Sequence, residues 1–158
     1  MSTYSIEDIA QSADRFKLFT LSCEQSKLME SANWLALYGI QTINIGKELA
    51  GFIDGLSDFN YLNIDVFDYI KKLLDKHKAK INNTGNEIVA IHNFGILLEP
   101  ALELNATKML KEFSKTAALI IVWENQSDSA GRMYWSNQPN TIFLDFTETP
   151  LKKIRYAL

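Results

Sequence analysis

Short apolar runs alternate along the chain with stretches in which apolar residues recur every three or four positions. A run of four to eight apolar residues is typical of a strand covered on both faces, and the wider spacing is typical of a helix with one buried side. The runs predict strands at 16–22, 40–45, 87–91, 118–123 and 141–146. The spacing predicts helices at 5–15, 24–38, 47–53, 63–78 and 101–114.

This alternation predicts the α/β class, specifically a three-layer sandwich with helices on both faces of a mostly parallel, five-stranded sheet. A length of 158 residues predicts one domain spanning 1–158. The pattern leaves the order of the strands open. In such a sheet ligands bind beyond the carboxyl ends of the strands, so the polar residues that follow each strand are the ones to inspect for function.

Composition narrows the class of protein. The chain is 47% hydrophobic and 22% charged with a net charge of -3, which fits a globular protein and argues against a general nucleic-acid surface. The single cysteine, Cys23, excludes an internal disulfide and favours a reducing compartment. The first fifteen residues are polar and do not resemble a signal peptide, and no run of eighteen apolar residues predicts a membrane span. We therefore expect a cytoplasmic protein.

The stretch Lys17–Met29 contains an apolar strand, a polar turn and the start of a helix, which is where a P-loop would lie. The pattern G-x-x-x-x-G-K-[ST] lets backbone N–H groups and a lysine hold phosphates, while the hydroxyl binds Mg²⁺. With Lys27 on the lysine position, Leu21 and Ser26 replace the glycines and Leu28 replaces the hydroxyl residue. The alternative is an ordinary strand-to-helix turn with an exposed lysine.

A second part of a hydrolytic site is also absent. The predicted third strand ends in His92 and Asn93, where P-loop enzymes carry an aspartate, and histidine does not replace a carboxylate around Mg²⁺. Asn125, after the fourth strand, is placed to orient a water, with a surface turn as the alternative. We assign no catalytic residue and no metal ligand. The candidate nucleotide-binding residues of this degenerate site are Ser22, Gln25, Ser26, Lys27 and Asn93.

Cys23, His92 and Glu124 all follow predicted strands. If they converge, Cys23 is placed as a nucleophile at a helix N-terminus, which lowers the pKa of a thiol. The alternative is an inert, partly buried thiol, and no local signature of a cysteine nucleophile is present. His77 and His92 lack the spacing of a metal site.

The segment 88–105 reads IVAIHNFGILLEPALELN and is followed by an apolar helix and strand at 108–123 and a Tyr- and Pro-containing loop at 134–140. From 16 to about 146 the chain resembles BrxF, the small P-loop-containing component of type 3 BREX phage-defence systems. The resemblance implies a P-loop NTPase-like fold with an AAA/RecA-like core. The family's glycine-rich loop is Ser22–Leu28 here, and its aspartate is His92, so the resemblance implies a divergent member with a degenerate P-loop.

Because the glycines, the hydroxyl and the acid of a hydrolytic site are absent, we expect an accessory or adaptor subunit that is not an enzyme and needs no cofactor. The resemblance implies a role in an antiphage defence complex, where this subunit would act through protein–protein contacts. Its partners would be a larger ATPase, another subunit of the system, or a second copy of itself. Phe59, Tyr61, Tyr134 and Trp135 could anchor a partner, with loop packing as the alternative. Two other functions stay open: an atypical ATPase subunit that binds ATP through Lys27, and a DNA-contacting subunit that uses the lysines of 71–80.

Overall fold

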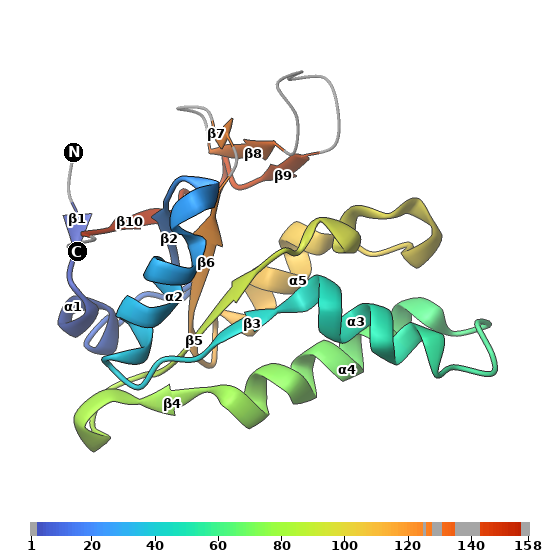
Figure 1. The fold of residues 1–158 in the computed structure, drawn as a ribbon, viewed down its shortest axis with the longest axis horizontal. Helices are drawn as coiled ribbons and strands as arrows, with labels where there is room; N and C mark the ends of the chain where they lie inside the picture. Colours follow the sequence, from blue (N-terminus) through green and yellow to red (C-terminus); the bar gives the residue numbers. More distant parts are fainter. Residues whose placement is uncertain (1–2, 125, 128–130, 135–142, 156–158) are drawn as a thin grey trace.

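We describe the protein from a computed structural model that covers residues 3–124, 126–127, 131–134 and 143–155. Within these residues the chain forms a seven-stranded sheet and a separate three-stranded sheet (Figure 1). The large sheet has the order β1 (Thr3–Tyr4), β10 (Lys152–Ile154), β2 (Leu18–Ser22), β6 (Ala118–Trp123), β5 (Glu87–His92) and β3 (Thr42–Asn44). These neighbours pair in parallel, while β4 (Ala79–Lys80) pairs antiparallel with the start of β5. The predicted mostly parallel α/β sheet is therefore confirmed.

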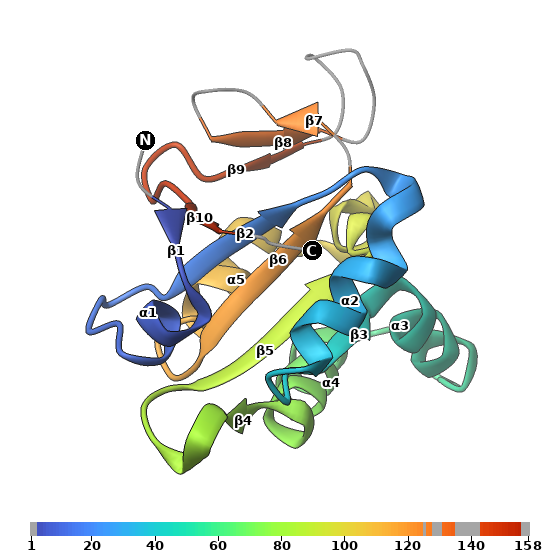
Figure 2. The ribbon, with the colours of Figure 1, turned by 60° about the vertical axis from the view of Figure 1, so that its left-hand side comes forward.

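Helices cover both faces of the large sheet, which makes the fold three-layered (Figure 2). They are α1 (Ile6–Ala10), α2 (Leu28–Ala36), α3 (Ile45–Asp54), α4 (Leu62–His77) and α5 (Ala106–Phe113). Because side chains alternate along a strand, β6 contributes to two cores. Leu119 and Ile121 pack in one core with α3, α4 and α5. Ile120 and Val122 pack in the other with α1 and α2.

The ends of two helices depart from the prediction for local reasons. Ser5 caps α1 through a reciprocal pair of bonds with Asp8, but the helix ends at Ala10 instead of 15. Helix α5 begins at Ala106 instead of 101, because Glu103 has a left-handed backbone with φ 49° and Asn105 provides the cap. Two 3₁₀ turns, Gly95–Leu98 and Pro100–Leu102, occupy the segment before it.

The fifth predicted strand is present, but its predicted place in the parallel sheet is wrong. The run at 141–146 contains β9 (Phe143–Asp145), which pairs antiparallel with β8 (Arg132–Tyr134) in the small sheet. The remaining small-sheet strand is β7 (Gln126–Ser127). The strand that joins the parallel sheet beside β2 is β10, in the polar tail. Apolar runs occur in covered antiparallel hairpins as well as in parallel strands, so the run alone did not distinguish the two.

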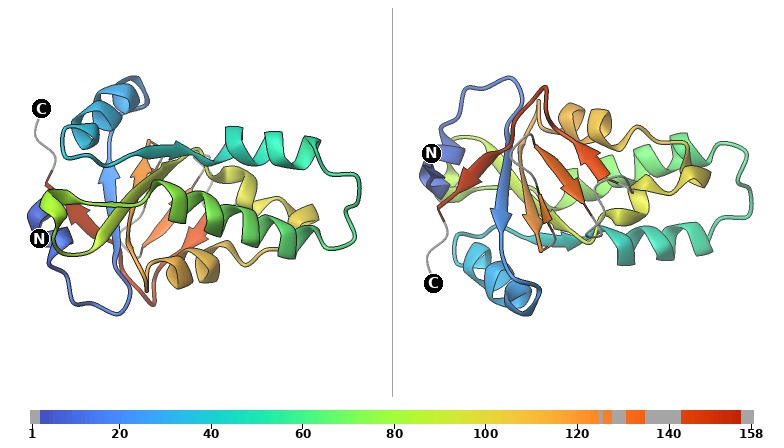
Figure 3. Two further views of the ribbon diagram at one scale, coloured as in Figure 1. Left: turned by 90° about the horizontal axis from the view of Figure 1, so that it is seen from below. Right: turned by 90° about the horizontal axis from the view of Figure 1, so that it is seen from above.

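The two-residue strands β1 and β4 were also missed, because two residues give no periodicity. As a result the large sheet has seven strands within the described residues where five were predicted. Two features project from the sandwich (Figures 1 and 3). The small sheet lies beyond the carboxyl end of β6, and α3 and α4 extend past the edge of the sheet as an arm that ends in the loop 55–61.

Candidate functional site at the carboxyl edge of the sheet

The turn after β2 is closed by its own backbone. Ser22 pairs with Trp123 at the end of β6, and the Cys23 N–H extends this pairing by donating to the Trp123 carbonyl at 3.0 Å. Residues Gln25–Lys27 then form one 3₁₀ turn, in which the Lys27 N–H donates to the Glu24 carbonyl at 2.8 Å. The Leu28 N–H donates to the Gln25 carbonyl. The backbone N–H groups of Cys23, Lys27 and Leu28, which a bound phosphate would need, are thus already hydrogen-bonded.

The backbone of this turn does not form an anion-binding nest. A nest requires neighbouring residues in right- and left-handed conformations, and the described residues with positive φ all lie outside 22–28. The Lys27 ammonium lies 3.5 Å from the Glu30 carboxylate, with both side chains about half exposed. Ser22, Gln25 and Ser26 are exposed beside it. The structure therefore brings four of the five candidate residues to one exposed turn.

Asn93, the fifth candidate residue, lies at a different junction. Its backbone is left-handed with φ 54°, its side-chain amide donates to Asn44 Oδ1 at 2.8 Å, and its carbonyl accepts from the Gly46 N–H at 2.8 Å. Asn44 Oδ1 also accepts from the Lys47 N–H and caps α3. Asn93 thus connects β5 to the start of α3. Strand β6 lies between β2 and β5 and separates this junction from the turn after β2.

Along the same edge of the sheet, three titratable groups lie at the ends of neighbouring strands. Cys23 follows β2, Glu124 follows β6, and His92 ends β5, so the three lie in the order Cys23, Glu124, His92 across the sheet. Each side chain is partly buried. Two atoms of this group, His92 Nδ1 and Glu124 Oε2, are buried without a hydrogen-bond partner in the described part of the chain.

Burial and the central carboxylate together determine the charge of this group. Burial raises the pKa of the Cys23 thiol, and the Glu124 carboxylate raises it further. The fully buried Ser31 hydroxyl lies close enough to oppose this rise in pKa, although it makes no hydrogen bond of good geometry. Burial lowers the pKa of His92, and Glu124 opposes that change. At neutral pH the thiol and the imidazole are both uncharged.

This arrangement does not suit a cysteine nucleophile. A relay of that kind places histidine between the thiol and the acid, so that the base takes the thiol proton and the acid orients the base. Here the acid lies between the other two groups and disfavours the thiolate. The order of these groups thus favours the interpretation of Cys23 as an inert, partly buried thiol over its interpretation as a nucleophile.

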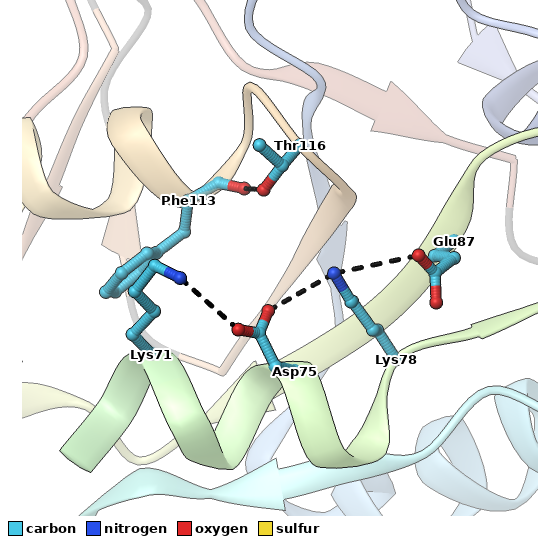
Figure 4. Close-up of polar contacts among 6 residues, drawn as sticks. All are labelled: Lys71, Asp75, Lys78, Glu87, Phe113 and Thr116. Atoms are coloured by element: carbon cyan, nitrogen blue, oxygen red, sulfur yellow. Dashed lines mark hydrogen bonds and ion pairs between the residues drawn. The ribbon is translucent and has the colours of Figure 1, made fainter. Parts of the chain in front are cut away.

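The sequence left open a DNA contact through the lysines near the end of α4. The Lys71 ammonium lies 3.4 Å from Asp75, and Lys78 lies 3.2 Å from Asp75 and 3.6 Å from Glu87 (Figure 4). These acids neutralise part of the positive charge. Such pairing is typical of a solvated helix end.

The four aromatic residues proposed as partner anchors divide into two groups. Phe59 and Tyr61 are 57% and 65% exposed in the loop at the end of the α3–α4 arm, where they are accessible to a partner. The side chain of Tyr134, together with Trp135 and Asn125, lies outside the described residues.

Two polar residues of this edge were not predicted. Ser31 is buried against Cys23, and Asn44 holds Asn93 and caps α3. The position of Asn44, directly before a helical apolar pattern, is a signal that could have identified the cap. Ser31 gave no comparable signal, because only the packing of α2 on the sheet brings it to Cys23.

Comparisons with known proteins give no further constraint. No family model, no curated protein and no solved structure matches this chain.

Among the described residues, no group of three or more His, Cys, Asp or Glu side chains is arranged to hold a metal ion. The helices in the described part of the chain are too short or too polar to cross a membrane.

Proposed function

We propose that the protein is a non-catalytic, P-loop-like accessory subunit that acts through protein–protein contacts. The observation that carries this proposal is the closed turn Glu24–Lys27, in which the Lys27 N–H bonds to Glu24 and the Lys27 ammonium faces Glu30. A phosphate cradle needs these donors free. The carboxylates of Glu24, Glu30 and Glu124 around the same edge further disfavour a polyphosphate.

The strand order supports a P-loop-like origin for the fold. Strands β2, β3, β5, β6 and β10 are successive core strands along the chain, and in the sheet they take the order fifth, first, fourth, third, second. That is the order of AAA-type P-loop cores, with the strand before the phosphate turn between the fifth and the fourth core strands. A retained scaffold with a closed phosphate turn is what a subunit selected for its surface would keep.

The resemblance to BrxF extends the proposal to a subunit of a bacterial antiphage defence complex. Its partner would be a larger ATPase of the same system or a second copy of this chain. Phe59 and Tyr61, exposed at the end of the arm, are the anchors we propose for this contact, since aromatic residues contribute strongly at interface centres.

Nucleotide titration tests the absence of a phosphate site. We expect no saturable binding of MgATP at concentrations up to about 1 mM, a weak limit for any specific site. Lys27→Ala should behave like the unchanged protein and like the control Lys72→Ala, which removes an exposed lysine of α4. ATP binding in the micromolar range that Lys27→Ala weakens about tenfold or more would refute the adaptor and establish an ATP-binding subunit.

Phage-plating assays test the role in defence. In a host carrying the cognate system, Lys27→Ala should retain protection, whereas Phe59→Asp with Tyr61→Asp should lose both protection and co-purification with the partner. Loss of protection with Lys27→Ala alone would contradict the proposal, as would full protection by the Phe59 and Tyr61 double variant.

A further inference from the structure

A separate cavity opens between α4 and α5. It has a volume of about 230 Å³ and lies at the amino-terminal edge of the sheet, because Thr116 and Ala117 at its wall directly precede β6. The closed turn at Glu24–Lys27 lies at the opposite, carboxyl edge. The cavity is therefore independent of the proposed function.

The walls of this cavity are apolar and fixed. Val89 and Leu119 rise from β5 and β6, and each is nearly fully buried. Leu74 comes from α4, and the rings of Phe67 and Phe113 meet across the two helices at 5.2 Å between centroids. A dry cavity of about 150 Å³ lined by such residues is large enough to hold benzene, so this one has room for a ring or a short branched chain and a polar head.

The mouth of the cavity is lined by ammonium groups from both helices. Lys71 and Lys78 lie on the α4 side, beside Asp75 (Figure 4). Lys115 lies on the α5 side, and its ammonium is 2.8 Å from Glu112. Lys78 also reaches Glu87, so three ammonium groups pair with three carboxylates around the cavity.

Hydrogen-bonding capacity at the mouth favours a bound acceptor. Each ammonium has three donors. Lys71 uses one on Asp75 at 3.4 Å and is 58% exposed, and Lys115 uses one on Glu112. Lys78 is more buried and bridges Asp75 and Glu87. Lys71 and Lys115 therefore keep donors for a further anion.

We propose that this cavity binds a small monocarboxylate whose apolar body is a single ring or a short branched chain. The body fills the space between Phe67, Phe113 and the two strands. The carboxylate lies at the mouth, where Lys71 and Lys115 donate to it.

A methyl-detected NMR titration with three matched probes tests the site. The probes are 3-phenylpropionate, its neutral amide 3-phenylpropionamide, and the cation 3-phenylpropylamine. We expect saturable shifts of the Leu74, Val89 and Leu119 methyl signals with the carboxylate, and affinities at least about fivefold weaker for the amide and the amine.

Variants separate the cavity from the charges. Lys71→Met with Lys115→Met should weaken 3-phenylpropionate binding about fivefold or more, while Lys72→Met, on α4 but outside the cavity, should change it less than about twofold. Ala117→Leu, which fills the cavity from its wall, should abolish the methyl shifts. The lysine variants test the site even where Ala117→Leu does not fold, because Lys71 and Lys115 lie at the surface.

Three results would overturn the proposal. The first is the absence of saturable shifts at concentrations up to about 10 mM, the weakest affinity that such a titration detects. The second is equal binding of the amide or the amine. The third is binding that the paired lysine substitutions leave unchanged. Equal binding of the amide would establish an apolar cavity without selection for a carboxylate, which is a different site.

Discussion

His92 shows how one buried side chain links the candidate site to the stability of the fold. Its ring lies at the end of β5, and Nδ1 makes no hydrogen bond within the described residues. Burial lowers the pKa of this histidine below the usual 6.5, and the Glu124 carboxylate opposes the shift only in part. The folded protein therefore holds the imidazole neutral under conditions in which the unfolded chain begins to bind a proton.

We predict that the free energy of unfolding falls as the pH falls through about 6.5, where the unfolded state binds more protons than the folded state. The uptake of one proton changes the free energy of unfolding by at most about 1.4 kcal/mol per pH unit, and solvent screening makes this change smaller. His92→Gln should remove this part of the pH dependence, measured by urea unfolding between about pH 5 and 8.

Asn33→Ala, on the exposed side of α2, is the control, because it removes a side chain that carries no titratable proton. An NMR titration of the His92 ring protons gives a direct measurement. A midpoint at or above 6.5 would contradict the prediction.

At the scale of single elements, α1 depends on a distant turn. A helix of five residues is too short to be stable by itself in water. Asn86, in the turn before β5, donates its backbone N–H to the Ala10 carbonyl at 2.8 Å and its side-chain amide to the carbonyls of Ile9 and Ser12 at 3.0 and 2.9 Å. Gly85 makes this approach possible, since its φ is +77° and a Cβ there would collide with the Ala10 carbonyl.

We predict that Asn86→Ala lowers the free energy of unfolding by about 1–3 kcal/mol, because it leaves two partly buried carbonyls without their donor. Asn33→Ala, on the exposed side of α2, should change stability by less than about 0.5 kcal/mol. Urea unfolding measures both. Equal effects of the two substitutions would show that Asn86 does not hold α1 to the turn.

At the scale of the whole molecule, β10 joins the N-terminal segment to the sheet. It pairs with β1 on one side and with β2 on the other, and Ile154 packs into the core shared with α1 and α2. We predict that Ile154→Ala lowers the free energy of unfolding by about 2–4 kcal/mol, the usual effect of truncating a buried isoleucine. Lys153→Ala, one residue earlier and exposed, should have little effect.

Urea unfolding followed by circular dichroism compares the two β10 variants. If Ile154→Ala lowers the free energy of unfolding no more than Lys153→Ala does, then β10 does not unfold cooperatively with the rest of the sheet. Backbone hydrogen exchange of β1 gives a second readout, since β1 should lose protection together with β10.

Local pattern was sufficient where an element is covered on both faces. The apolar run Ala118–Trp123 predicted the strand β6 with its observed ends, because a fully buried strand has no polar position to obscure it. The helix predicted from 63 or 65 to 78 is α4 within one to three residues at its ends, since its apolar stripe repeats over four turns. The turn at 22–28 was also recognised from sequence as lacking the glycines and the hydroxyl of a P-loop.

Only the tertiary structure decided the strand order, the identity of the fifth parallel strand and the grouping of the candidate residues. The β10 strand escaped detection because two of its three residues, Lys152 and Lys153, are lysines, and Lys152 is placed by contacts with residues far away in the sequence. Its ammonium pairs with Asp14 and lies 5.6 and 5.7 Å from the ring centroids of Tyr4 and Phe19. Asn93 followed a predicted strand, yet its amide is used by Asn44 on another strand. Both outcomes depend on residues far apart in sequence, and local periodicity carries no information about such contacts.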